Sequence, residues 1–513
     1  MAESNEKVAA SPSEKVESIN STASPVDNQT HDERDLDDAY RYLNSHTDAE
    51  TDQINLKALR RKIDWHIIPI MFMCYVLQFV DKVVINYAAV MGINKDLKLT
   101  KNDFSNVGSA FFIALLVAEV PTGYILQKVP PGKWLGVNVT LWGVCCAAGA
   151  GAFNYHSLIA SRIFLGIFEA AIAPSLMLIS SQYYNKKEQA PRFSIWYCGL
   201  GVGQVLGGLT SFAFQHVHNT SFKSWQAMFV FIGCSTSLIG IACFFILPDS
   251  PMKAGFLTET EKSALLKHVA ENQTGIHNGH FKWSHIWEAV TDIQLWFMTI
   301  CTVCISVSSG VVTTYSATLI QGMGFSSYRT ALLNMPSGAV SIIAALAVGY
   351  GVRHTENRWA WLAFCCVPGM IGGGLMSFLP KDHRAGLLAG VYLVNAITGT
   401  LTVIYQWTMS NVAGHTKRTV AAALIAGSFS IGNIIGPQTF QAKDAPDYRP
   451  AKIAVMATQA GGAVMSMALF VYYIWANKQK DKKQLATTEL PGASEELWDN
   501  KTDKENPNFR YVY

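Results

Sequence analysis

Twelve apolar segments, each about long enough to cross a lipid bilayer as a helix, follow one another along this 513-residue chain. Half of all residues are hydrophobic and 15% are charged, so the polar residues concentrate in short joints and at the two ends. We therefore predict an all-α membrane protein with 12 transmembrane helices in two six-helix bundles. The segments lie near residues 66–88, 104–126, 134–153, 157–180, 192–214, 226–247, 293–317, 329–351, 359–379, 386–410, 419–440 and 452–475.

Polar stretches divide the chain into five parts. Residues 1–60 and 477–513 are rich in charged and small polar residues and lack an apolar period, so we expect disordered tails there. Residues 61–247 and 291–476 hold six apolar segments each, and a polar, partly helical loop at 248–290 separates them. Two six-helix domains around a central loop are predicted.

The basic residues that flank the spans indicate how the chain lies in the membrane. Lysines and arginines of the short loops fall about equally on both sides, whereas basic clusters precede the first span and follow the last. An even number of spans puts both tails and the central loop on one side, which we expect to be cytoplasmic. The sequon at Asn219 would then face outward, in a loop too short to favour glycosylation. The clusters are Arg60, Arg61 and Lys62, and Lys478, Lys480, Lys482 and Lys483.

Several classes of function are disfavoured by composition. The net charge of +3 indicates no nucleic-acid partner, and all ten cysteines lie within apolar segments, which argues against disulfides or zinc. The histidine pairs His216/His218 and His277/His280 have no further ligands nearby, so we expect no metal site. An enzyme is not expected, because there is no large soluble domain and no nucleophile–base pair.

The first span carries an unusual set of polar residues. Tyr75, Gln78, Lys82 and Asn86 are spaced three, four and four residues apart, so they share one face of a helix, and Asp81 adjoins Lys82. Ionisable residues within spans usually line water-filled paths or pair with other helices. We interpret the stripe as one wall of a polar cavity. The alternative is a charged pair near the helix end that reaches the membrane interface.

Two further spans place carboxyl groups in apolar surroundings. Arg162 and Glu169 in the fourth span are two turns apart on one face, and Pro174 follows and should bend the helix. A carboxylate in such surroundings can take a proton near neutral pH, as a proton-coupled carrier requires. Alternatively, Arg162 and Glu169 only join helices. Glu119, before Pro121 in the second span, could titrate or could cap a polar contact between helices.

Candidates for the remaining walls of the cavity come from three other spans. Gln204 adjoins glycines spaced by four residues, a pattern typical of close helix packing. Polar residues in the tenth span recur at helical spacing, and Asn433 stands alone in the eleventh. The tenth-span residues are Asn395, Thr398, Thr402 and Tyr405.

Short motifs make the chain resemble the major facilitator superfamily. The joint from Gly123 to Lys133 is similar to the superfamily's loop motif, except that Gln127 replaces the usual aspartate, and Gly349–Arg353 is a faint counterpart in the second half. The resemblance narrows to the anion:cation symporter family through Asp81-Lys82, the fourth-span pattern from Arg162 to Pro174, and Pro248-Asp249-Ser250-Pro251. It narrows further to the fungal allantoate permease branch through Gly436-Pro437-Gln438-Thr439-Phe440 and the tail from Glu505 to Tyr511.

The resemblance implies import of a small organic anion together with a proton, by a monomer in the plasma membrane lipid bilayer. The proton gradient is the energy source and no cofactor is implied. Family substrates include allantoate, ureidosuccinate, vitamin-type carboxylates and sulfur-containing acids. Many relatives outside the branch carry arginine where this chain has Lys82, so the cation is kept here but the planar fork that grips a carboxylate is lost.

The resulting hypothesis gives each residue a role. The anion would bind mid-membrane near Tyr75, Gln78, Lys82 and Gln204, with Asn395, Tyr405 and Asn433 opposite. Glu169 would take the proton, with Asp81 or Glu119 assisting, and so free Arg162 or Lys82 to hold the anion. Two alternatives remain: a metabolite or drug exporter working as an antiporter, and a nutrient sensor that no longer transports.

Overall fold

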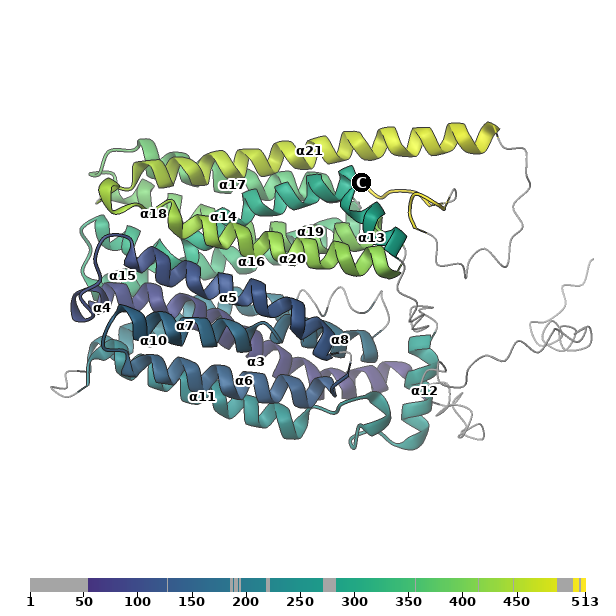
Figure 1. The fold of residues 1–513 in the computed structure, drawn as a ribbon, viewed down its shortest axis with the longest axis horizontal. Coiled ribbons are helices and arrows are strands. Elements are labelled where there is room, and N and C mark those ends of the chain that lie inside the picture. The colour runs from purple at the N-terminus through teal and green to yellow at the C-terminus, as the bar shows by residue number, and fades with distance from the viewer. Residues whose placement is uncertain are drawn as a thin grey trace, which may run out of the picture.

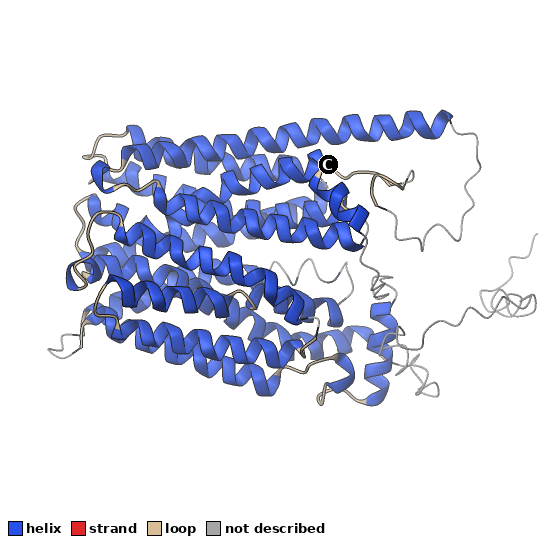
Figure 2. Ribbon diagram, viewed as in Figure 1, coloured by secondary structure: helices blue, strands red, loops and turns tan. Residues whose placement is uncertain are grey.

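The computed structural model describes residues 54–126, 128–184, 188, 192, 195–217, 222–270, 283–355, 357–413, 415–445, 447–486, 502–506 and 509–513. Within these residues the regular structure is helical throughout, and the helices pack side by side in two groups that follow each other along the chain (Figures 1 and 2). Eleven helical segments of the described part are long and apolar enough to cross a bilayer. The predicted all-α membrane fold is confirmed.

The N-terminal half contains the helices up to residue 246, and the C-terminal half contains those from residue 293. The N-terminal helices are α3 (Leu56–Met91), α4 (Ile93–Asp96), α5 (Asp103–Leu126), α6 (Pro131–Ala148), α7 (Tyr155–Glu169), α8 (Ile172–Tyr183), α10 (Gly199–Gln215) and α11 (Ser224–Ile246). The connecting helices are α12 (Glu259–Ala270) and α13 (Trp283–Val290). The C-terminal helices are α14 (Ile293–Gly322), α15 (Ser327–Asn334), α16 (Pro336–Thr355), α17 (Arg358–Phe378), α18 (Arg384–Val394), α19 (Ile397–Asn411), α20 (His415–Gln438) and α21 (Arg449–Ala486).

The long helices run between two ends of the molecule. One end, at the right of Figure 1, carries α12, α13 and the last residues of the chain; we call it the terminal side. The opposite end carries α4 and α15, and we call it the distal side. The predicted fifth span at 192–214 corresponds to α10, whose 17 residues begin after a helical stretch at 195–197 and a turn at Cys198.

The fourth span of each half is broken near its middle. In the N-terminal half the break separates α7 from α8 at Ala170 and Ala171. Pro174 lies four residues after Ala170 and has no N–H to donate to the Ala170 carbonyl, which explains the interruption. In the C-terminal half Asn395 and Ala396 separate α18 from α19. The breaks occupy equivalent places in the two halves, and irregular backbone at such depth is tolerated where it lines a cavity.

The predicted boundaries of the N-terminal and C-terminal tails need correction. Asn55 caps α3, because its side chain accepts hydrogen bonds from the backbone N–H groups of Lys57 and Ala58, so residues 56–60 are helical rather than disordered. At the other end α21 continues to Ala486, and residues 502–506 and 509–513 pack against the C-terminal half, with Asp503 fully buried. The remainder of the predicted tails, 1–53, 487–501 and 507–508, lies outside the described residues, as do Gln127 and Asn219.

Glycines set the closest helix contact in the N-terminal half, between α6 and α11. A Cβ on Gly233 would lie 2.5 Å from the carbonyl oxygen of Gly143 and closer still to the backbone nitrogen of Ala147. A Cβ on Gly143 would lie 2.5 Å from the backbone nitrogen of Ser237. The two backbones touch directly, so an added methyl group must push the helices apart.

We predict that Gly233→Ala destabilises the protein by about 1–3 kcal/mol, the usual cost of overpacking a tight contact. Gly123→Ala is the matched control: Gly123 also lies inside a helix, but a Cβ there meets nothing within 4 Å. Thermal unfolding in detergent, followed by loss of monodisperse protein, measures both. Equal unfolding temperatures for the two variants would refute the close α6–α11 contact.

Candidate functional site

A cavity lies between the two halves at the level of the broken helices. Helices of both halves contribute to its walls, and Glu169 and Asn395 line it from the two breaks. Eight of the eleven side chains predicted to bind substrate or protons line this one cavity. They are Tyr75, Gln78, Lys82, Glu119, Glu169, Asn395, Tyr405 and Asn433.

The strongest interaction in the cavity joins Lys82 to Glu169. The Lys82 Nζ lies 2.9 Å from Oε1 of Glu169, and Gln78 donates a hydrogen bond of 2.9 Å to the same oxygen. Glu169 is 1% exposed, and its second oxygen, Oε2, has no hydrogen-bond partner among the described residues. Lys82 and Gln78 lie one turn apart on α3, so the stripe predicted from the sequence converges on this single carboxylate.

A second ion pair lies outside the cavity. Arg162 Nη1 is 3.9 Å from Oδ2 of Asp81, and both side chains are buried. The Arg162 guanidinium also lies 5.5 Å from the centre of the Phe229 ring. Neither Arg162 nor Asp81 lines the cavity; Arg162 borders a smaller void that it shares with Lys82. Adjacent positions on a helix point about 100° apart, so Asp81 faces the interior of the N-terminal half while Lys82 faces the cavity.

Glu119 faces the cavity from α5 and has no direct partner in the described part of the chain. Neither a hydrogen bond nor an ion pair to its carboxyl group is found there, in contrast to Glu169. Among the described residues, two carboxyl groups and one ammonium group therefore line the cavity. All three belong to the N-terminal half.

The opposite wall, as far as the described residues form it, is neutral. Asn395 uses its amide to donate to the backbone carbonyl of Val391, and Asn433 donates to that of Phe429, which leaves Asn433 Oδ1 without a partner among these residues. Tyr405 and the hydroxyl groups of Ser309, Thr313, Thr398 and Ser430 also belong to the polar part of this wall. The C-terminal half thus lines the cavity with hydrogen-bonding groups and aromatic surface.

Gln204 does not lie where the sequence analysis predicts. It is 1% exposed and does not line the cavity, and neither atom of its amide has a hydrogen-bond partner in the described part of the chain. Its side chain lies at the crossing of α10 and α16, where a Cβ on Gly338 would come within 3.2 Å of it. The glycine pattern of α10 lets the halves approach here, so Gln204 is enclosed by packing.

Aromatic residues of the cavity were missed by the sequence analysis. Trp196 meets the Tyr75 ring edge-on at 4.7 Å between centroids, and Tyr197 lies 5.5 Å from the same ring. Phe429 lines the facing wall. A tryptophan–tyrosine pair at the start of a span is common at membrane interfaces, so the sequence alone did not distinguish it from an interfacial anchor.

Hydrogen bonds between the halves form a seal on the distal side of the cavity. Asn86 donates to Ser316 at 2.8 Å and accepts from the backbone of Ala317, and Asn334 donates to Ser316 and to Tyr87. Asn86, Ser316 and Asn334 are fully buried. Asn86 therefore belongs to this seal and not to the wall of the cavity.

The seal continues between α5 and the distal ends of α14 and α20. Ser105 shares a hydrogen bond of 2.5 Å with Tyr315 and donates to the carbonyl of Phe440, and the Tyr315 and Phe440 rings stack at 4.1 Å. These contacts involve no charged group. Because the distal side is closed by them, the structure corresponds to a state that is shut on that side.

A cluster of carboxylates on the terminal side has a spacing that could suit a metal ion. Oxygens of Glu288, Asp292 and Asp503 all lie within 4.8 Å of one another. The ammonium group of Lys417 lies 2.6–2.8 Å from all three, so it occupies the position that a cation would take. The cluster is an internal ion network.

Comparisons with known proteins agree with this architecture. Residues 71–437 match the model of the Major Facilitator Superfamily. The chain is 37% identical over 460 residues to the thiamine pathway transporter of Saccharomyces cerevisiae, covering 88% of this chain and 86% of that one. It is 31% identical over 492 residues to the allantoate permease of the same yeast, covering 93% and 90%.

Solved structures resemble the chain in fold alone. A D-xylose–proton symporter superposes with a TM-score of 0.61 at 14% identity, covering 78% of this chain and 97% of its own. An inward-facing, occupied bacterial homologue of the human lysosomal transporter Spinster superposes with a TM-score of 0.58 at 15% identity, covering 80% and 96%. This chain belongs to the major facilitator superfamily of secondary transporters, as the matched family model and the relatives show.

Proposed function

We propose that the protein is a proton-coupled symporter that imports a small organic anion by alternating access. The observation that carries the proposal is the contact between Lys82 and Glu169 in the cavity. The residues that the structure describes on the opposite wall are uncharged. Lys82 is the cation that borders the cavity in the described part of the chain, whereas Arg162 is paired with Asp81 outside it. A single ammonium group suits one carboxylate or a similar monoanionic group on the substrate.

In the proposed mechanism, protonation of Glu169 lets the substrate anion replace Glu169 as the partner of Lys82. While Glu169 is ionised, its carboxylate occupies the Lys82 ammonium and competes with an anion for it. Protonation removes this competition, and Oε2 of Glu169 has no partner among the described residues that would prevent it from holding the proton. The anion and the proton therefore bind as a pair and leave as a pair. Glu119 borders the same cavity and is the second candidate for the proton.

The direction of transport follows from the proposed orientation. The basic clusters at both ends of the chain favour a cytoplasmic terminal side, as the positive-inside rule describes. With the distal seal closed, the structure then represents a state that is shut on the outward side. The similarity to an allantoate permease supports carboxylates of that general kind as substrates. A plasma-membrane location is part of the same proposal.

We predict that Glu169→Gln abolishes proton-driven accumulation of anion but leaves exchange of substrate across the membrane. A glutamine cannot bind or release a proton, yet it leaves Lys82 free in the way a protonated Glu169 would. Counterflow and uptake of radiolabelled allantoate and ureidosuccinate in proteoliposomes with an imposed pH gradient measure the two activities. Glu119→Gln is the comparison: unchanged accumulation in Glu169→Gln, with loss in Glu119→Gln, would assign the proton to Glu119 instead.

We predict that Lys82→Met lowers uptake of the anion by roughly 30-fold or more, because loss of a buried charge partner costs about 2–5 kcal/mol. Lys82→Arg should retain uptake, since it keeps the positive charge. The same uptake assay measures both variants. Equal losses for the two would show that the shape of the lysine matters and not its charge, which would contradict anion recognition by Lys82.

We predict that Asn86→Ala weakens the distal seal and shifts the protein toward the state that is open on the distal side. The variant removes the buried hydrogen bonds from Asn86 to Ser316 and Ala317. A cysteine introduced at Ser105, which is 1% exposed within the seal, reports the shift through its labelling by a membrane-impermeant maleimide added outside intact cells. The same chain with the native Ser105 provides the background from the ten native cysteines.

Measurements in cells distinguish uptake from export. A deletion strain tested for growth on single nitrogen or sulfur sources identifies the substrate, and efflux of the preloaded substrate is then compared with its uptake. Faster net efflux than uptake under an inward proton gradient would favour an exporter over the proposed symporter. Absence of both activities, with the chain present at the cell surface, would favour a sensor.

A further inference from the structure

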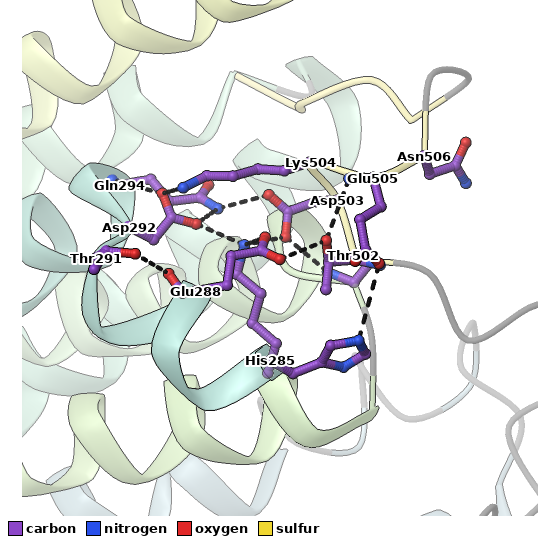
Figure 3. A network of polar contacts seen from close by, with 12 residues as sticks. His285, Glu288, Thr291, Asp292, Gln294, Thr502, Asp503, Lys504, Glu505 and Asn506 are labelled. Atoms are coloured by element: carbon purple, nitrogen blue, oxygen red, sulfur yellow. Dashed lines mark hydrogen bonds and ion pairs between the residues drawn. The ribbon is translucent and has the colours of Figure 1, made fainter. Parts of the chain in front are cut away.

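The last described residues of the chain are fastened to the terminal side of the C-terminal half. We use the name docked segment for residues 502–506 and 509–513, which lie beside α13 and the terminal end of α21 (Figures 1 and 3). We propose that a peptide-binding groove of the C-terminal half holds this segment as an internal ligand, and that its docking keeps the terminal end of α19 away from the N-terminal half. The segment would thus favour the state that is open on the terminal side.

Two asparagines recognise the backbone of the segment. Asn411 at the end of α19 accepts from the N–H of Val512 at 2.7 Å and donates to the Val512 carbonyl at 2.9 Å. Asn477 on α21 does the same for Tyr511, at 2.9 Å for both bonds. Each side-chain amide pairs with both polar groups of one peptide residue, as a neighbouring strand would. This is the way in which an extended peptide is held by main-chain hydrogen bonds.

The aromatic side chains of the segment fill the groove. Tyr511 is 5% exposed and stacks on Tyr473 of α21 at 5.1 Å, and Phe509 meets the edge of Tyr511 at 5.3 Å. The ammonium group of Lys480 lies 5.3 Å from the Phe509 ring and 5.1 Å from the Tyr511 ring. It also donates to the backbone carbonyls of Asp503, Asn506 and Phe509, so it contacts both described parts of the docked segment.

Charged groups fix the start of the segment (Figure 3). Asp503 is fully buried; one of its oxygens lies 2.7 Å from Lys417 and the other accepts from Tyr511 and from Gln294. Lys504 lies 3.2 Å from Asp292. Burial and then the charge of Asp503 hold the pKa of Tyr511 well above its usual value, so its hydroxyl stays a hydrogen-bond donor.

The segment connects helices that must stay together when the halves move. Thr502 donates to Glu288 of α13 at 2.9 Å, the Trp407 indole of α19 donates to the Val512 carbonyl at 2.8 Å, and the N–H of Arg358 on α17 donates to Tyr513 at 2.8 Å. These contacts reach α13 and the C-terminal half, as do those of Asn411, Asn477 and Lys480. The segment therefore ties the terminal end of α19 to α21. Figure 1 shows it beside α21, across the molecule from α3 and α10.

The link to the cavity runs along α19. Tyr405, which lines the cavity, lies two residues before Trp407 and six before Asn411, so all three are carried by the half-helix that begins after the break at Asn395 and Ala396. In the proposed alternating access, closure of the terminal side brings this half-helix toward the N-terminal half. A docked segment opposes that approach, because it holds the end of the half-helix from the other side.

The docking itself is tested first, in the full-length chain. Thr502 is fully buried, so Thr502→Cys should be protected from a maleimide applied to the terminal side in inverted vesicles. Adding Lys480→Met should raise its labelling rate by about ten-fold or more, because several hydrogen bonds to a charged donor are lost. Lys482→Met is the matched control, since Lys482 lies on the same helix and is exposed. Rapid labelling of Thr502→Cys without a second variant would refute the groove.

The effect on the transport cycle is tested separately, and it rests on the proposed alternating access and orientation. With Ser105→Cys as the reporter of the distal seal, Lys480→Met should raise labelling from outside about three-fold or more, and Lys482→Met should not. If Lys480→Met frees Thr502→Cys but leaves Ser105→Cys unchanged, the groove stands and its control of α19 is refuted. If Asn86→Ala also leaves the reporter unchanged, the failure belongs to the proposed transport cycle.

A milder variant covers the case in which Lys480→Met does not reach the membrane. Tyr511→Phe removes only the hydroxyl that donates to Asp503 and keeps the ring that stacks on Tyr473. It should raise labelling of both reporters in the same direction and by less. Labelling equal to that of the Lys482→Met control at both reporters would overturn the proposal.

Discussion

The ion pair of Lys82 and Glu169 is the interaction on which the proposed transport mechanism depends. Burying two opposite charges is costly, and their attraction offsets the cost only while both partners stay charged and in contact. At 2.9 Å inside a cavity, the pair is stable as it stands, but protonation of Glu169 or arrival of an anion changes its balance at once. In the proposed mechanism, protonation of Glu169 frees the Lys82 ammonium group for an anion without requiring a large movement.

The rest of the fold places that pair beside the cavity and closes the distal side. The break between α7 and α8 places Glu169 at the end of a helix beside the cavity, and the break between α18 and α19 places Asn395 across from it. The distal seal is made of neutral hydrogen bonds and stacked rings, which can open without separating charges. Charges are instead found on the terminal side, where Lys417 pairs with Asp503 of the docked segment as well as with Glu288 and Asp292.

Features with a local physical cause could be predicted from the sequence. The spans follow from runs of apolar residues, and the stripe of Tyr75, Gln78 and Lys82 follows from helical spacing, so the cavity wall on α3 was predicted with its residues. Glu169 was selected because a carboxylate in an apolar span can take a proton near neutral pH. The resemblance to a known family added the superfamily and the kind of substrate to test, but not the geometry.

Features that depend on contacts between distant segments could not be predicted. Arg162 and Glu169 share a helix face, yet Arg162 pairs with Asp81 and leaves Glu169 to Lys82. This choice depends on how the side chains of α3 and α7 meet in the folded bundle. Gln204 has the composition of a cavity residue but is enclosed by the glycine contact with α16. Residues 502–506 and 509–513 belong to a stretch polar enough to suggest disorder, and their partners lie on helices such as α19 and α20, far away in sequence.

The protonation state of Glu169 is the central quantity, and infrared difference spectroscopy of the purified full-length protein measures it most directly. Acidification should produce a carbonyl stretching band of a buried, protonated carboxyl group. The proposed mechanism predicts that this band is lost in Glu169→Gln and persists in Glu119→Gln. A band that persists in Glu169→Gln, or one that disappears only in Glu119→Gln, would contradict it.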